Sequence, residues 1–220
     1  MPRVLATLKP RKFPLQARSA ATIETLHLAA IQVLTKEGLG RCTTTRIAVR
    51  AGISVGSLYQ YYPNRDALLA AVLKQHLDAV AGAVEQACRA GHGKPVEAMA
   101  FALVTTFLDA KLRDPAKSRA LYAFGQERGG AQLAARHRAQ MVTAIAAMLS
   151  SAPDARFEDS AVTAMMALGV MMGPVQAVLE GRAPPEFAAR LERELVVLLS
   201  SYLQAHRSPL NQSGKPATAT

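Results

Sequence analysis

The most informative stretch of this sequence is positions 43–69, TTTRIAVRAGISVGSLYQYYPNRDALL. They contain two short helical patterns, at 44–51 and 55–62, separated by a turn of three residues that includes Gly52. Two short helices joined by a three-residue turn with a glycine predict a helix-turn-helix. Because such a turn requires a positive φ, we expect Gly52 to adopt a left-handed conformation.

Capping residues set the ends of these helices. Thr43 and Ser54 each precede a helical pattern and can accept hydrogen bonds from its free backbone N–H groups. Pro63 ends the second helix, and Asn64 can cap a longer helix that begins at Arg65. The sequence therefore predicts both the two short helices and the start of the third.

The helix at 55–62 has a buried and an exposed face. Leu58 and Tyr62 are four residues apart and are expected to point into a three-helix core. A glycine within a helix costs up to about 1 kcal/mol relative to alanine, which makes sense at Gly56 if another surface approaches the backbone closely. The outward positions are Val55, Gly56, Tyr59 and Gln60, with Ser57 and Tyr61 at the flanks.

The positive charge of the chain lies around this motif. The net charge is +10, and residues 1–65 contain ten Lys and Arg against two acids, so this segment alone carries +8. Such an asymmetry predicts binding of a polyanion, although a solvated basic face explains the charge equally well. Arg65 stands at the first position of its helix, where the helix dipole disfavours a cation unless an anion binds there.

The rest of the chain predicts a helical bundle, so the expected fold class is all-α. Half of the residues are hydrophobic, tryptophan is absent and aromatic residues make up 5%, a composition typical of packed helices. The expected helices are 19–37, 44–51, 55–62, a helix from 65 into the 80s, 94–112, 116–125, 130–150, 157–180 and 185–205.

Several classes of protein are disfavoured. The two cysteines, Cys42 and Cys88, exclude a disulfide scaffold and fit a reducing cytoplasm. The five histidines are scattered and no nucleophile has an evident partner, so we expect no enzyme, no metal site and no cofactor. The uncharged stretch 161–179 is long enough to cross a bilayer, but its composition and Pro174 favour a helix buried between other helices or subunits.

Residues 43–69 resemble the DNA-binding region of the tetracycline-repressor (TetR) family of bacterial transcription regulators. The shared pattern is a threonine-led helix with Ile-Ala, then Ala-Gly, a hydrophobic residue and Ser, and a recognition helix with a small residue, Leu and Tyr. The remainder of the chain is similar only in layout. The resemblance implies an α-helical regulatory domain there, whose last two long helices form a dimeric four-helix bundle.

The resemblance also implies which residues contact DNA. Val55 replaces a residue that is frequently basic or polar, Tyr61 replaces a frequent histidine, and Arg65 stands for the usual lysine. The arm at 1–18 would add contacts to phosphates or the minor groove. The implied DNA contacts are Thr44, Arg46, Ser54, Val55, Gly56, Ser57, Tyr59, Tyr61 and Arg65.

On this basis we divide the chain into five parts. They are a basic arm (1–18), a helix-turn-helix DNA-binding domain (19–65), a connecting helix (66–90), a ligand-binding and dimerisation domain (91–207) and a disordered tail (208–220). The dimer interface is expected on the helices at 157–180 and 185–205, which have more apolar surface than a small monomer can cover. Candidate lining residues of a ligand pocket are Met99, Phe101, Thr105, Phe107, Tyr122, Phe124, Met141, Met165 and Met166.

The sequence therefore predicts a homodimeric, cytoplasmic, nucleoid-associated regulator that does not bind a membrane. We expect it to bind a palindromic double-stranded DNA operator as a repressor and to release it when an apolar small molecule enters the C-terminal domain. Two alternatives stay open. One is a ligand-independent DNA-binding protein, and the other is a helical-bundle enzyme or lipid carrier with an auxiliary basic module.

Overall fold

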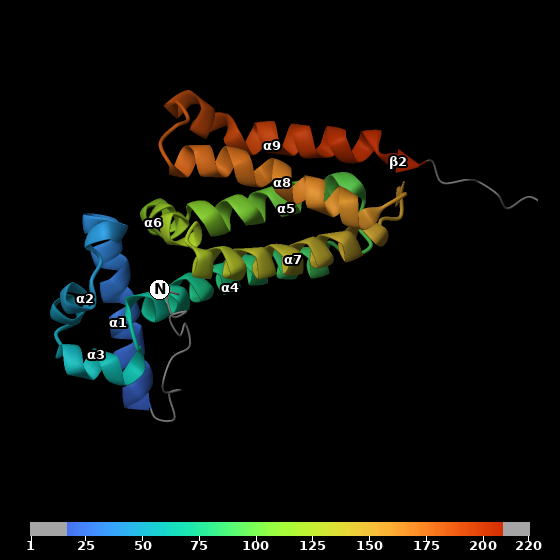
Figure 1. Cartoon of the computed structure of the whole chain (residues 1–220). Helices are drawn as coiled ribbons and strands as arrows, with labels where there is room; N and C mark the ends of the chain where they lie inside the picture. The colour runs from blue at the N-terminus through green and yellow to red at the C-terminus, as the bar shows by residue number, and fades with distance from the viewer. Residues whose placement is uncertain (1–16, 209–220) are drawn as a thin grey trace, which may run out of the picture.

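The computed structural model describes residues 17–208, so most of the predicted basic arm and tail lie outside the described residues. Nine α-helices make up nearly all of this part, which confirms the all-α fold (Figure 1). They are α1 (Ala17–Glu37), α2 (Thr44–Ala51), α3 (Val55–Tyr61), α4 (Arg65–Gly91), α5 (Val96–Leu112), α6 (Pro115–Gly125), α7 (Arg128–Ser150), α8 (Ser160–Leu179) and α9 (Pro185–Ala205). A 3-10 turn, η1 (Leu39–Arg41), follows α1.

The helix-turn-helix contains the helix caps that the sequence predicts. The side chains of Thr43, Ser54 and Asn64 accept hydrogen bonds from backbone N–H groups in the first turns of α2, α3 and α4, at 3.3, 3.0 and 2.8 Å. Gly52 ends α2 with φ 68° and ψ 28°, the left-handed conformation expected of the turn. Ala48 is completely buried, which allows the short helices to pack closely.

The helices pack around two hydrophobic clusters. The first joins α1, α2, α3 and the beginning of α4, and the second joins the end of α4 to α5, α7, α8 and α9. Leu68 and Leu69 of α4 belong to the first cluster, whereas Val80 and Val84 belong to the second. In Figure 1, α4 leads from the N-terminal helices into the bundle, so this one helix forms part of both cores.

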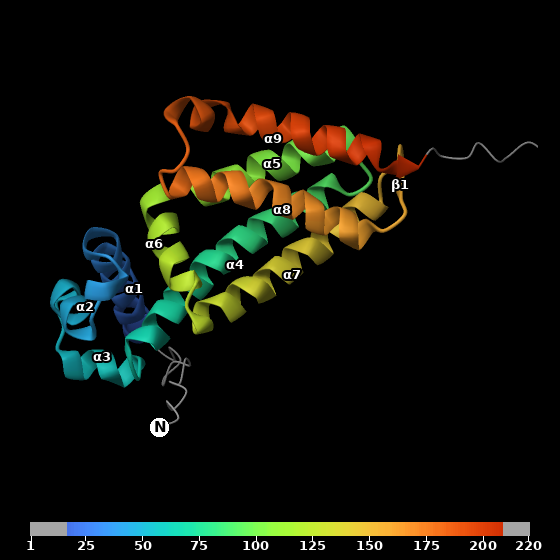
Figure 2. The ribbon, with the colours of Figure 1, turned by 45° about the horizontal axis from the view of Figure 1, so that its top comes forward.

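Helix α6 also connects the N-terminal helices, α1 to α3, with the bundle. It contacts α1 and η1 on one side and α7 and α8 on the other (Figure 2). Leu121 and Phe124 of α6 are buried in the first cluster, together with residues of the helix-turn-helix. Where α7 begins, a side chain at Gly130 would meet the carbonyl oxygen of Phe124 and lie 2.8 Å from the Cα of Gly125, so α6 and α7 approach closely there.

Some helices start at residues that differ from the expected ones. Helix α8 begins at Ser160 rather than 157, because the Asp159 carboxylate caps it and Arg156–Phe157 forms β1, which pairs antiparallel with β2 (Arg207–Ser208). Helix α5 begins at Val96 rather than 94, because its free N–H group donates to the carboxylate of Asp154 at 3.1 Å. The first helix includes Ala17, two residues before the expected start at 19.

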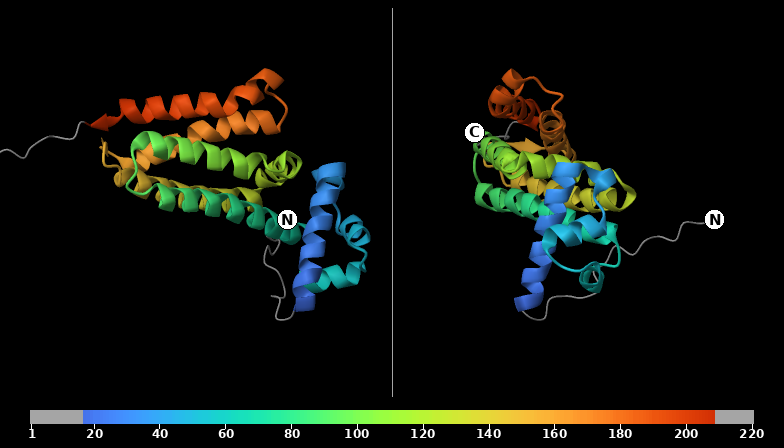
Figure 3. Two further views of the ribbon diagram at one scale, coloured as in Figure 1. Left: turned by 180° about the vertical axis from the view of Figure 1, so that it is seen from behind. Right: turned by 90° about the vertical axis from the view of Figure 1, so that its left-hand side faces the viewer.

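Helices α8 and α9 form a layer on one side of the bundle, away from α2 and α3 (Figure 3). By length and composition, α4 and α8 could each cross a membrane, and 56% and 39% of their most apolar windows are buried in the protein. Helix α8 continues through Pro174. It leaves Val162, Met165 and Met166 exposed, so residues 17–208 leave one apolar face of this helix uncovered.

Candidate functional site

The outer face of α3 brings together several residues that the sequence assigns to DNA contact. Tyr59 is 41% exposed, and its hydroxyl forms a 3.3 Å hydrogen bond with the hydroxyl of Thr44 at the start of α2. Ser54 and Ser57 lie at the start of α3, with their hydroxyl oxygens 2.8 Å apart. This surface therefore presents a row of hydroxyl groups across two helices.

Other predicted contact residues on α3 are less exposed. Val55 and Tyr61 are half-buried and pack against the first hydrophobic cluster, because α3 is short and lies close to the helices beneath it. Gly56 is exposed, and a side chain there would meet only the Ser54 hydroxyl, at 3.7 Å. Packing among residues 17–208 therefore gives no reason for a glycine at this position.

The two arginines in the predicted set have acidic partners within the chain. Arg46 forms an ion pair with Glu37 at the end of α1. Arg65 donates from Nε to Asp66 at 2.8 Å and from Nη1 to the carbonyl oxygen of Leu39 at 3.4 Å. Both side chains remain partly exposed, so these pairs leave N–H donors available to an anion.

Sequence analysis missed two residues on this side of the protein and left one cysteine unassigned. Val49 on α2 is 75% exposed although it is hydrophobic, and Arg50 donates from Nε to the side-chain oxygen of Gln32. Their positions beside buried Ile47 and Ala48 would have placed them on the outer face by helical periodicity. Cys42 is buried, and this burial raises the pKa of its thiol to about 11, which keeps it protonated.

A second candidate site is a cavity of about 230 Å³ inside the bundle. Five helices form its walls, from α4 to α8. The lining residues are mostly apolar, with a few polar side chains among them, which is the composition of a small-molecule site. They include Leu73, His76 and Leu77 of α4, Phe107 and Lys111 of α5, Ser118, Leu121 and Tyr122 of α6, Ala134, His137, Arg138 and Met141 of α7, and Met172 of α8.

Three buried polar groups of this cavity stand out. The Nε2 atom of His76 and the hydroxyl of Tyr122 are buried without a hydrogen-bond partner. Burial, with a smaller effect of Lys111, lowers the pKa of His76 to about 4, so the imidazole is neutral at pH 7. Lys111 is only 7% exposed, and burial together with Arg138 lowers its pKa to about 8. The ammonium group lies 5.0 Å from the centre of the Tyr122 ring.

The remaining buried histidine of the cavity has partners. His137 contacts the carboxylate of Asp78 through Nε2 and the carbonyl oxygen of Leu133 through Nδ1, both at 2.8 Å. The Asp78 carboxylate also accepts from Lys74, so it is already shared by two side chains. Among residues 17–208, no three His, Cys, Asp or Glu side chains gather as metal ligands.

The structure separates the nine predicted lining residues into groups. Phe107, Tyr122 and Met141 line the cavity. Met99 is buried in the bundle core, and Phe124 is buried against the helix-turn-helix instead of facing the cavity. Both side chains fill hydrophobic cores and leave no space for a ligand.

The other four predicted residues lie on outer surfaces. Phe101, Met165 and Met166 are 55%, 61% and 49% exposed, so we correct their assignment: they belong to the outward faces of α5 and α8. Thr105 borders a surface groove between α5 and α9, and its hydroxyl donates to the carbonyl oxygen of Phe101 at 2.9 Å. Apolar character did not distinguish inward from outward positions on these helices.

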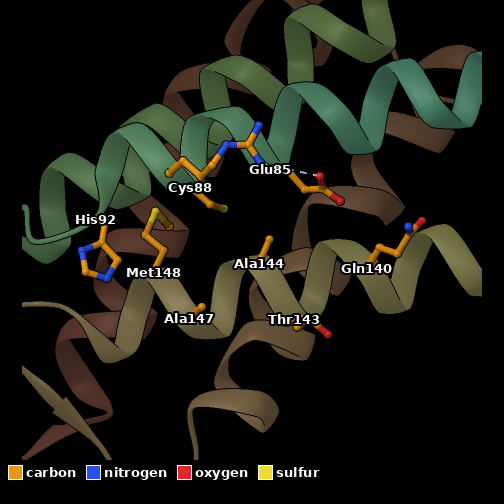
Figure 4. A pocket seen from close by; sticks show the side chains of 9 residues that line it. Glu85, Cys88, His92, Gln140, Thr143, Ala144, Ala147 and Met148 are labelled. Atoms are coloured by element: carbon orange, nitrogen blue, oxygen red, sulfur yellow. Dashed lines mark ion pairs between the residues drawn. The ribbon is translucent and has the colours of Figure 1, made fainter.

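A larger, more open groove of about 430 Å³ lies between α4 and α7 (Figure 4). Cys88 of α4 and His92, which follows this helix, border it from one side, and Ala147 and Met148 of α7 from the other. Its charged residues, Glu85 and Arg89, pair with each other at 3.8 Å. None of its described side chains has a buried polar atom without a partner, in contrast to the cavity.

An exposed recognition helix, a long connecting helix and a helical domain with an internal cavity define the class of helix-turn-helix transcription regulators. Residues 28–72 match the family model of bacterial regulatory proteins of the tetR family, and residues 95–203 match that of the tetracyclin repressor-like C-terminal domain. The chain belongs to the TetR family of transcriptional regulators. No curated protein matches it in sequence.

Solved structures share the fold at low sequence identity. A candidate TetR-family regulator from Mesorhizobium loti is 17% identical, with a TM-score of 0.71 over 88% of this chain and 100% of that one. SmeT, the repressor of the Stenotrophomonas maltophilia multidrug efflux pump SmeDEF, is 18% identical, with a TM-score of 0.67 over 89% and 94%. FadR, a fatty acid degradation regulator from Bacillus halodurans, is 16% identical, with a TM-score of 0.62 over 80% and 97%.

Proposed function

We propose that this TetR-family regulator is a homodimeric repressor in the bacterial cytoplasm, associated with the nucleoid. It binds a palindromic operator through α2 and α3 and is released when a small molecule enters the cavity of its own C-terminal domain. The observation that carries this proposal is the position of Leu121, which lines the cavity and is also buried in the core of the helix-turn-helix. A ligand beside Leu121 therefore acts on the packing of the DNA-binding helices.

The outer face of α3 supports direct contact with DNA. Gly56 is exposed, and packing in the described part of the chain does not require a glycine there, so the close approach of a DNA backbone explains it. The hydroxyls of Thr44, Ser57 and Tyr59 can donate to phosphates, and the exposed part of the Tyr59 ring can pack against sugars or thymine methyl groups. The charge of +8 in residues 1–65 supplies the nonspecific attraction.

The exposed layer of α8 and α9 supports dimerisation. Val162 and Met165 of α8 and Val197 and Leu198 of α9 are large hydrophobic residues that are about half exposed or more. Exposed apolar surface of this kind marks an interaction surface. A two-fold dimer through this layer would present two copies of α3, which must match half-sites about 34–36 Å apart.

The DNA-binding part is tested with genomic fragments that the full-length protein selects. A gel-shift titration should show a two-fold symmetric site and an affinity that falls steeply with salt. Tyr59→Ala should weaken binding about tenfold or more, whereas Phe101→Ala, at a more exposed aromatic residue on α5, should leave it unchanged. Equal effects of the two substitutions, or equal affinity for all fragments, would contradict the proposal.

The effector part is tested with the same operator and a panel of small aromatic compounds. Release of the operator by any of them should be lost when Leu121→Met or Met141→Trp fills or reshapes the cavity. Sequence-specific binding that no compound changes would instead favour a ligand-independent regulator. Catalytic turnover or copurified lipid together with sequence-independent DNA binding would favour a bundle enzyme or lipid carrier.

A further inference from the structure

We propose that the cavity between α4, α5, α6, α7 and α8 binds a small organic anion, a carboxylate attached to a single apolar ring, with its charge on Lys111. The inference rests on the proposed effector-responsive function, because it names the class of molecule that occupies the same cavity. It arises from three polar groups that the fold buries beside one another and leaves without adequate partners.

Lys111 carries the first part of the argument. It lies on the buried face of α5, four residues after Phe107, and lines the cavity with 7% of its surface exposed. None of the ion pairs among the described residues includes it. A buried ammonium group without a carboxylate is unfavourable, and the ring of Tyr122 accepts no conventional hydrogen bond from its three donors. The environment of Lys111 therefore favours an anionic ligand.

The acids around the cavity have other partners. Asp78 is shared between Lys74 and His137, and the side chain of Asp114 caps α6 by accepting from the N–H group of Lys117. Glu180, whose charge acts on Tyr122, accepts from Gln176 and from Arg182. Arg138 lies at the edge of the same cavity and adds a second positive charge near Lys111. The electrostatic field of the cavity is therefore positive, which favours a ligand of negative charge.

Two further polar groups can orient the ligand in the cavity. The hydroxyl of Tyr122 and the Nε2 atom of His76 line the cavity and have no partner, although each loses hydration by burial. Tyr122 can donate to a carboxylate oxygen beside Lys111, and a neutral His76 can donate or accept according to its tautomer. Together the three groups can bind both oxygens of one carboxylate.

The size and the walls of the cavity define the rest of the ligand. An apolar cavity of about 150 Å³ holds a benzene molecule, so a cavity of about 230 Å³ has room for one ring with a carboxylate. Leu73, Leu77 and Met141 provide apolar contact for the ring. A neighbouring cavity of about 210 Å³ shares His76 and Ser118 with this one, which gives a substituent on the ring room to extend.

The test is calorimetric titration of the full-length dimer with three probes of equal size: benzoate, benzamide and benzylamine. Benzoate should bind at least tenfold more tightly than the neutral amide, and the cation should not bind. Lys111→Met keeps an unbranched side chain one atom shorter and removes the charge, so it should lose at least tenfold in benzoate affinity. Lys94→Met, at an exposed lysine before α5, is the matched control and should bind benzoate as the native protein does.

A second variant keeps the test decisive if Lys111→Met folds poorly. Tyr122→Phe removes only a hydroxyl that has no partner, so its melting temperature should equal or exceed that of the native protein. Its affinity for benzoate should nevertheless fall severalfold. Unchanged benzoate affinity in both variants would show that the anion does not bind at these groups and would overturn the inference.

The other outcomes separate this inference from the proposed function. Equal or tighter binding of benzamide would overturn the anionic class and leave an effector-responsive repressor intact. Benzoate that binds through Lys111 without changing operator affinity would support the anion site and contradict effector release. If none of the three probes binds, the inference is wrong, and operator release by other compounds would still test the repressor.

Discussion

The helix-turn-helix and the cavity of the bundle differ in whether their buried polar groups have hydrogen-bond partners. In the helix-turn-helix, the capping side chains each accept a backbone hydrogen bond, and the buried hydroxyl of Tyr62 lies 2.7 Å from Nε2 of His27. In the cavity, His76 Nε2 and the Tyr122 hydroxyl have no partner, and Lys111 has no acid. Each region has a buried hydrophobic core, so the lack of a core does not explain the difference.

This difference indicates where each region binds another molecule: on its outer surface or in its interior. In the helix-turn-helix the buried polar groups named above have hydrogen-bond partners, and hydroxyls and a glycine lie on the outer surface. This is the arrangement expected of a rigid element that docks against another molecule. The bundle keeps unsatisfied groups inside, where only a small molecule can reach them. Leu121 and α4 join the two regions, so a partner in one can influence the other.

The largest effect is expected from a cavity made in the first core. Leu58→Ala removes a fully buried side chain of α3 and should lower the free energy of unfolding by about 2–5 kcal/mol. Hydrogen exchange should then show lost protection in α1–α3 while α8 and α9 stay protected. Leu28→Ala, at a 55% exposed position of α1, should change stability by less than about 0.5 kcal/mol. Loss of protection throughout the chain would show that the two cores are not separable.

The next prediction concerns the unsatisfied interior of the bundle. The pKa of His76 is about 4 in the folded protein against 6.5 in an unfolded chain, because of burial and the nearby cations Lys111 and Lys117, opposed by Asp114. Between these values the unfolded state binds more protons, so stability falls as the pH drops from 6.5 to 4, by up to about 3 kcal/mol. Above pH 6.5 this contribution is constant.

Urea denaturation at a series of pH values measures this effect. His76→Gln should flatten the loss of stability between pH 6.5 and 4, whereas His92→Gln, at an exposed histidine after α4, should retain the native slope. Identical slopes in all three proteins would mean that His76 takes up its proton over the same pH range in the folded and the unfolded state. The cavity would then be better hydrated than its buried walls indicate.

The junction between the two regions is tested at Gly130. A methyl group there would meet the carbonyl oxygen of Phe124, which is backbone and cannot turn away, so Gly130→Ala should cost about 1–3 kcal/mol. Gly82→Ala, in an open position of α4, should instead stabilise the protein by up to about 1 kcal/mol. Thermal unfolding measures both changes, and equal shifts of the melting temperature would contradict the close approach of α6 and α7.

The helix-turn-helix was predictable from the sequence because local interactions define it. Thr43, Ser54 and Asn64 each cap a helix through an N–H group three residues away, and Gly52 supplies its own conformation. The start of α5 was not predictable in this way. Its N–H group at Val96 bonds to Asp154, 58 residues further along the chain, and only the tertiary fold brings these groups together.

The cavity was predicted only in part, for a related reason. Apolar residue types identified Phe107 and Met141, but they also selected Phe101, which is exposed beside the buried Ala100. The polar members of the site were detectable by spacing, since Lys111 follows Phe107 by four residues and His76 follows Val72 by four. A polar residue on an otherwise apolar helix face is a signal that selected Thr105, which does not line the cavity, and was not applied to Lys111 and His76.

The smallest effect is expected at Arg65, which separates a structural role from a DNA-binding role. Its pair with Asp66 is partly exposed, so Arg65→Ala should change stability by less than about 1 kcal/mol. If the arginine also contacts a phosphate, the slope of log affinity against log salt should become shallower by about 0.9 per contact. Arg193→Ala, which breaks the comparable Arg193–Glu194 pair on α9, should leave the slope unchanged. A marked loss of stability with an unchanged salt slope would show that Arg65 serves to tie α4 to the carbonyl of Leu39 instead of binding DNA.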